Sequence, residues 1–211
     1  MSLLITSAIE AELAPLAEVL QAKKIDSGWE SPIARLLPLG IGPIQALSSL
    51  LRFKEPITEL LFIGTAGYFD ADQFQIGELV QAQSVTLFDG ATLLGQAHFA
   101  LMQNSPPLIA SGPTLGLKAV TVANSLSVTR GTTLARAVQQ DTNCAVENLE
   151  LYGVAYGAAQ LEVPWAALLG LTNQVGPEGQ QQWQTNHKNI ALQSSQFLVE
   201  HGFLDPPHQR M

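Results

Sequence analysis

This sequence contains little cysteine and little histidine. The single cysteine, Cys144, excludes an intrachain disulfide, and its apolar surroundings predict a buried thiol with a packing role. The histidines have neither the i, i+4 spacing nor the cysteine neighbours of a metal site; they are His98, His187, His201 and His208. We therefore predict no metal and no cofactor.

Positive charge is also scarce, since ten Lys and Arg stand against eighteen Asp and Glu, for a net charge of −8. So few cations suit the phosphates of DNA or RNA poorly, and we expect a small-molecule ligand and no nucleic-acid partner. No apolar run is long enough to span a bilayer, and the first residues lack the basic segment of a secretory signal. We expect a cytoplasmic protein that does not bind membranes.

Apolar residues are abundant: they make up 46% of the 211 residues, and only 13% are charged. This composition predicts one substantial core and a single domain over residues 1–211. We expect strands at 3–7, 34–39, 60–63, 78–88, 117–124, 144–146 and 165–171, and helices at 10–20, 44–53, 132–140, 150–161 and 180–201. A surface excursion is expected between the strands at 78–88 and 117–124, and a frayed tail at 206–211.

The expected strands are apolar without strict alternation, which is typical of strands covered on both faces. Alternation of these strands with helices predicts the α/β class. The predicted architecture has three layers, with a mostly parallel mixed central sheet flanked by helices.

Polar side chains follow two of the expected strands at the points where they end. Glu147 and Glu150 come after the strand at 144–146, and Asn173 follows the strand at 165–171. Ligands of open α/β sheets bind outside the carboxyl ends of strands, so these side chains are candidate substrate contacts. Two alternatives stay open: the carboxylates also suit the first turn of a helix, and Asn173 also suits a turn. The small residues of Gly64–Gly67 predict a tight turn that lets the backbone approach a ligand.

Six motifs along nearly the whole chain resemble, in the same order, those of the nucleoside phosphorylase and nucleosidase superfamily. They are Ser7–Glu12, Gly40–Pro43, Gly64–Gly67, Ile76–Val80, Val146–Glu150 and Thr172–Gly176. The superfamily includes methylthioadenosine/adenosylhomocysteine nucleosidases and futalosine hydrolases. The last motif, continued by Pro177 and Glu178 and followed by Trp183, most resembles the futalosine hydrolases.

The resemblance implies hydrolysis of the N-glycosidic bond of a purine nucleoside. In the futalosine hydrolases this reaction releases hypoxanthine from futalosine and belongs to menaquinone biosynthesis. Such cleavage builds positive charge on the ribose and negative charge on the purine. By the family pattern, Glu150 holds the ribose hydroxyls, Glu12 activates water and Asn173 stabilises the leaving purine. The resemblance implies further substrate contacts at Thr65, Ala66, Gly67, Val128, Thr129, Glu147 and Leu149. It also implies a homodimer, because the superfamily closes the 5′ side of the ribose with a neighbouring subunit.

The chain departs from the family pattern at three positions. Asn173 stands where adenine-specific nucleosidases have Asp, and an amide that donates N–H without releasing a proton favours a 6-oxopurine. Leu169 stands where the family carries an arginine that organises the water site. Tyr152 follows the ribose glutamate where small residues are usual, and we expect it to narrow the pocket.

Several alternatives remain open at this level. Methylthioadenosine/adenosylhomocysteine nucleosidase is one; purine nucleoside phosphorylase is another, although its phosphate cradle needs more arginines than this chain offers. Leu169 also suits a non-catalytic nucleoside-binding protein of the same fold. Among single residues, Glu12 also suits a solvated helix charge, and Trp183 either covers the base or packs the last helix.

Overall fold

The computed structural model describes residues 3–98 and 106–204. Its helices are α1 (Glu10–Val19), α2 (Pro43–Arg52), α3 (Gly90–Leu93), α4 (Thr132–Thr142), α5 (Leu151–Gln160) and α6 (Gly179–Glu200). Its strands are β1 (Leu3–Ser7), β2 (Lys23–Ile25), β3 (Gly28–Glu30), β4 (Ala34–Pro38), β5 (Glu59–Tyr68), β6 (Leu79–Leu87), β7 (Leu108–Ile109), β8 (Lys118–Asn124), β9 (Val146–Glu147) and β10 (Trp165–Gln174).

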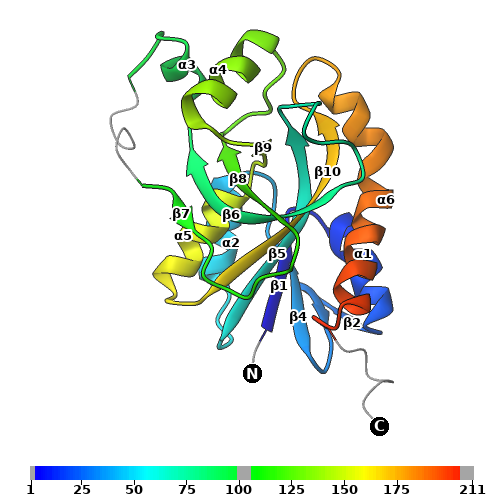
Figure 1. Ribbon diagram of the computed structural model, residues 1–211. Coiled ribbons are helices and arrows are strands. Elements are labelled where there is room, and N and C mark those ends of the chain that lie inside the picture. The colour runs from blue at the N-terminus through cyan, green and yellow to red at the C-terminus, as the bar shows by residue number, and fades with distance from the viewer. Residues whose placement is uncertain (1–2, 99–105, 205–211) are drawn as a thin grey trace.

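One mixed sheet runs in the order β10-β6-β8-β9-β5-β1-β4-β3-β2, and β7 pairs with β6. Strands β4, β1, β5 and β10 are mutually parallel neighbours, so their carboxyl ends meet at one edge. Strand β10 also pairs with β6 in antiparallel fashion, which closes the path from β10 through β6, β8 and β9 back to β5. The mixed sheet flanked by helices agrees with the predicted fold class (Figure 1).

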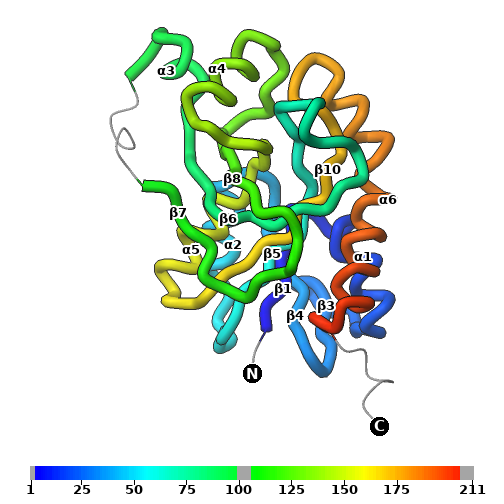
Figure 2. Tube along the Cα trace, viewed as in Figure 1, coloured from blue at the N-terminus to red at the C-terminus, as the bar shows by residue number. Residues whose placement is uncertain are grey.

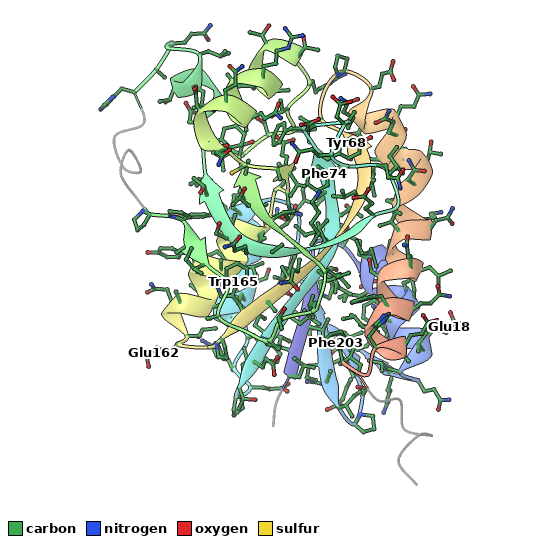
Figure 3. The ribbon with its side chains drawn as sticks, in the orientation of Figure 1. Glu18, Tyr68, Phe74, Glu162, Trp165 and Phe203 are labelled. Carbon is green, nitrogen blue, oxygen red and sulfur yellow. The ribbon has the colours of Figure 1, made fainter. Side chains whose placement is uncertain are left out.

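Helices cover both faces of the sheet because its central strands are apolar on both faces. Leu168 of β10 packs in a core cluster with residues of α1 and α6, whereas its neighbour Leu169 packs in a second cluster with residues of α2 and α5. Figure 2 shows α6, late in the chain, beside α1, early in the chain. In Figure 3, Trp165 of β10 lies inside the molecule, whereas Glu18 and Glu162 lie at its surface.

Two features of the sheet differ from the sequence-based expectations. The turn expected at Gly64–Gly67 is wrong: these residues continue β5, where they pair with Leu169–Asn173 of β10. Small residues are needed there for close packing, since a Cβ at Gly67 would lie 2.7 Å from the Asn173 side-chain nitrogen. Strand β10 likewise continues past Leu171, through an irregularity between Leu171 and Asn173, to Gln174.

The structure also contains a hairpin that was not expected, and some of the segments considered in the sequence lie outside the described residues. The hairpin of β2 and β3 was not expected, because both strands are short and largely polar. The excursion expected after β6 contains α3 and β7, and its residues 99–105 lie outside the described part, as does the tail at 206–211. Among the helices of residues 3–98 and 106–204, none has the length and apolar character needed to cross a membrane.

We predict that Gly153→Ala destabilises the protein by about 2 kcal/mol, although alanine is the better helix former. Gly153 lies where α5 crosses α2, and an added methyl group would collide with the backbone of Pro43. The free energy of unfolding is measured by denaturant titration. Gly131→Ala, whose methyl group would meet nothing within 4 Å, serves as the control. Equal stability of the two variants would contradict tight α2–α5 packing.

Candidate active site

A cavity of about 290 Å³ opens at the carboxyl ends of β1, β5, β9 and β10. All but one of the residues proposed from sequence line it: Glu12, Thr65, Ala66, Gly67, Val128, Glu147, Leu149, Glu150 and Asn173. The exception is Thr129, which is buried and donates hydrogen bonds to Glu147. Strand pairing therefore brings together side chains from opposite ends of the chain.

Glu12 lies in the first turn of α1, directly after β1, and only 5% of its surface is exposed. Its Oε1 accepts a 3.1 Å hydrogen bond from the Thr65 hydroxyl. Its Oε2 is buried and has no hydrogen-bond partner among the described residues. This burial does not fit a solvated helix charge, and one carboxylate oxygen of Glu12 has no partner among the described residues.

Burial, together with the negative charge of Glu150, raises the pKa of the Glu12 carboxyl to about 7, although the hydrogen bond from Thr65 opposes the increase. A carboxyl that titrates near neutral pH can both take and return a proton at that pH. Glu12 thus has the properties of a general base.

Glu150 follows β9 and immediately precedes α5, and it is also buried. The backbone N–H of Gly42 donates to its Oε1 over 2.9 Å, and the Asn148 amide donates to its Oε2 over 3.2 Å. Gly42 has φ 87°, a conformation that glycine adopts without strain. Burial raises the pKa of Glu150, and the hydrogen bond from Gly42 opposes this. Each carboxylate oxygen keeps a lone pair for a ligand hydroxyl.

Asn148 was not singled out from the sequence. Its Oδ1 accepts from the backbone N–H groups of Glu150 and Leu151, at 2.9 and 2.8 Å, and so caps α5. Its Nδ2 donates to the Thr65 carbonyl of β5 over 3.0 Å as well as to Glu150. An asparagine just before a helix is a common capping pattern, which was the signal available in the sequence.

Glu147 lies in β9, so the first-turn alternative does not describe it. Thr129, only 2% exposed, donates to the Glu147 carboxylate from both its backbone N–H and its hydroxyl. Burial raises the pKa of Glu147, and both of these hydrogen bonds oppose it. Thr129 therefore holds Glu147 and positions its neighbour Val128, which is partly exposed at the cavity.

Asn173 lies within β10 and is half-buried, so it does not occupy a turn. Its Oδ1 accepts a 2.8 Å hydrogen bond from the Thr172 hydroxyl, and its Nδ2 donates to the Gln174 carbonyl over 3.1 Å. A primary amide carries two N–H donors, so one remains for a ligand. Gly67 and Gly179 give this amide the space that it occupies.

Trp183 of α6 lines the cavity, and its indole N–H donates to the Thr65 hydroxyl over 3.0 Å. Its ring stacks on His187 at a centroid distance of 4.4 Å. Leu169 is fully buried beside Gly64 and does not line the cavity. Tyr152 does not line it either, so the expected narrowing of the pocket by Tyr152 is not found.

The described residues that line the cavity include three glutamates but no Lys, Arg or His. Within residues 3–98 and 106–204, no cluster of three His, Cys, Asp or Glu side chains is arranged to hold a metal ion. The chemistry available in this cavity is therefore that of carboxylates, amides, hydroxyls and backbone N–H groups.

We predict that Asn148→Ala lowers the free energy of unfolding by about 2 kcal/mol, because the α5 cap and the link to β5 are both lost. Asn148→Ser keeps a capping oxygen but not the amide donor, and we expect it to recover roughly half of that loss. Denaturant unfolding of the three proteins measures the difference. A wild-type stability for Asn148→Ala would show that the cap does not support this site.

No protein-family model matches the chain. The futalosine hydrolase of Streptomyces coelicolor is 27% identical in an alignment 224 positions long, gaps included, that covers 91% of this chain and 92% of that protein. Among solved structures, a Helicobacter pylori 5′-methylthioadenosine/S-adenosylhomocysteine nucleosidase superposes with a TM-score of 0.82 at 15% identity, covering 96% of this chain and 98% of that one. The native futalosine hydrolase of the same organism gives a TM-score of 0.81 at 15% identity, covering 96% and 97%. The chain therefore has the fold of the nucleoside phosphorylase and nucleosidase superfamily, and it resembles futalosine hydrolase along nearly its whole length.

Proposed function

We propose that this protein is a nucleosidase that hydrolyses the N-glycosidic bond of a purine nucleoside, with futalosine as the substrate and hypoxanthine as the released base. The observation that carries the proposal is the presence of two buried carboxylates, Glu12 and Glu150, in one cavity with the amide of Asn173. The likeness to a curated futalosine hydrolase over 91% of the chain supports the choice of substrate.

In this proposal Glu150 binds the sugar. Its two oxygens accept hydrogen bonds from the vicinal ribose hydroxyls while Gly42 and Asn148 hold the carboxylate in place. Its negative charge faces the ribose as positive charge develops there. Other cavity residues contact the substrate: Thr65, Ala66, Gly67, Val128, Glu147 and Leu149.

Glu12 activates the water in this proposal. Its unpaired Oε2 accepts a proton from a water molecule, whose oxygen forms a bond to the anomeric carbon of the ribose. The glycosidic bond breaks as its electron pair moves to the purine, and the purine anion becomes free hypoxanthine by taking a proton from solvent. Glu12 afterwards returns to solvent the proton that it accepted. Asn173 donates an N–H to the departing base, and this fits the ring nitrogen or carbonyl oxygen of a 6-oxopurine.

The charge of the cavity favours water over phosphate as the acceptor. Three glutamates line the cavity, and its described lining contains no basic side chain to offset a phosphate anion. Arg35, one of the few arginines, is already paired with Glu30 and Glu55.

We also propose that the protein works as a homodimer. Ile41 and Val128, which line the cavity, are 62% and 45% exposed, and Ile44 and Leu126 near them in the sequence are 70% and 71% exposed. Exposed apolar side chains of this kind favour a protein interface. Sedimentation of a monomer at the concentrations used for assays would contradict this part of the proposal.

We expect the protein to release hypoxanthine from futalosine without added phosphate, as measured by chromatography. Inosine, methylthioadenosine and adenosylhomocysteine complete the substrate panel, each with and without phosphate. Adenine release in place of hypoxanthine release would identify the methylthioadenosine/adenosylhomocysteine nucleosidase alternative, and ribose 1-phosphate would identify a phosphorylase. If no base is released but a nucleoside raises the melting temperature, the protein is a binding protein.

We expect kcat/KM for the substrate to fall as the pH is lowered through about 7. The base acts only when Glu12 is ionised, and its pKa is raised to about 7, so the ionised fraction grows from pH 6 to pH 8. Glu12→Gln keeps the side-chain size and is expected to lower kcat by about 10²- to 10⁴-fold. A rate that is flat from pH 5.5 to 8.5 would contradict this role of Glu12.

A further inference from the structure

Trp183, Thr65 and Glu12 form a chain of hydrogen bonds that joins three elements at the cavity. The Trp183 indole of α6 donates to the Thr65 hydroxyl of β5 over 3.0 Å, and this hydroxyl donates to Glu12 Oε1 of α1 over 3.1 Å. The cavity is lined by all three residues.

The direction of this chain is fixed by the chemistry of its groups. An indole nitrogen only donates, so the Thr65 oxygen must accept from Trp183. The hydroxyl has a single hydrogen, which is then committed to Glu12. Glu12 Oε1 is thereby held as an acceptor, and Oε2 is the carboxylate oxygen left without a partner among the described residues.

Trp183 is itself held in place. Its ring is stacked on His187 with an interplanar angle of 12°. His187 lies one helical turn later, with its Nδ1 within hydrogen-bond distance of the Trp183 carbonyl. The Asn186 amide of the same helix donates to the Thr172 carbonyl of β10 over 3.0 Å. An indole fixed in this way can orient the hydroxyl that it contacts.

The groups that favour an ionised Glu12 are neutral. They are the Thr65 hydroxyl and the nearby backbone of Ile9 and Ala8. The titratable side chains around this region are Glu150 and Glu147, which line the same cavity, and His187, which stacks on Trp183. Leu169 is buried and apolar, so it contributes no charge.

We propose that Trp183 is a positioning residue for Glu12: by fixing the Thr65 hydroxyl as a donor, its indole N–H orients the general base and stabilises the ionised carboxylate without a cation. This inference rests on the proposed hydrolysis, because it gives Trp183 a part in the same reaction. Trp183 thus makes a defined hydrogen bond in addition to lining the cavity.

Trp183→Phe tests the proposal, because it keeps a ring to stack on His187 and removes the N–H. We expect kcat to fall about three- to tenfold, with KM nearly unchanged, because one hydrogen bond to the base is weakened. The acid limb of the pH–rate profile should move to higher pH, since the ionised carboxylate loses support. Thr65→Val should produce the same shift, and adding Trp183→Phe to it should cause little further loss.

Two controls separate this role from folding and from other titrations. Trp29→Phe removes an indole in β3, away from the cavity lining, and should leave the profile unchanged. His187→Phe removes the neighbouring imidazole and should leave the acid limb in place. A limb that disappears with His187→Phe would overturn the assignment to Glu12.

A measurement independent of activity uses the indole ¹⁵N–¹H resonance of Trp183, assigned by its loss in Trp183→Phe. We expect this resonance to shift with pH at the midpoint of the acid limb, and the shift to vanish in Glu12→Gln. An active wild type with an unchanged profile in Trp183→Phe would overturn the inference and leave the proposed function standing. If the wild type hydrolyses no nucleoside, the proposed function fails, and a resonance that does not titrate would overturn the hydrogen-bonded chain as well.

Discussion

The burial of three carboxylates in one cavity without a basic side chain among its described lining residues is the constraint on which this structure depends. A buried carboxylate is costly unless donors meet it, and here the donors are neutral groups. Gly42 and Asn148 donate to Glu150, Thr129 donates to Glu147, and Thr65 donates to Glu12. Helices α2 and α5, strand β5 and the loop before α4 must therefore keep their positions for the cavity to exist.

Much of the fold follows from apolar patterns that are local in the sequence. The runs at 3–7 and 165–171 are apolar on both faces, and this is sufficient to predict buried strands with helices on both sides. The error at Gly64–Gly67 has a physical cause: glycines usually interrupt strands, but here pairing with β10, more than 100 residues later, overrides that preference. The β2–β3 hairpin escaped prediction because its short strands carry little apolar signal.

The candidate site was predictable only in part. Glu150 and Asn173 were candidates from their positions at strand ends, and the resemblance added Glu12 and the three roles. The structure brings all three residues to one cavity, although their roles remain proposals. The roles of Asn148 and Trp183 depend on Thr65, which is remote from both in the sequence. The Trp183 indole and the Thr65 hydroxyl, for example, are 118 positions apart. Sequence patterns give the residue types at such positions, but the direction of a hydrogen bond requires the folded geometry.

The central place of β10 has a consequence for folding during synthesis. This strand lies between β5 and β6 and pairs with both, although they end 97 and 78 positions before it begins. Until residues 165–174 leave the ribosome, β5 and β6 each present an open edge, and such edges favour wrong pairing. The closed sheet can therefore form only after β10 has been synthesised, later than both of the strands that it joins.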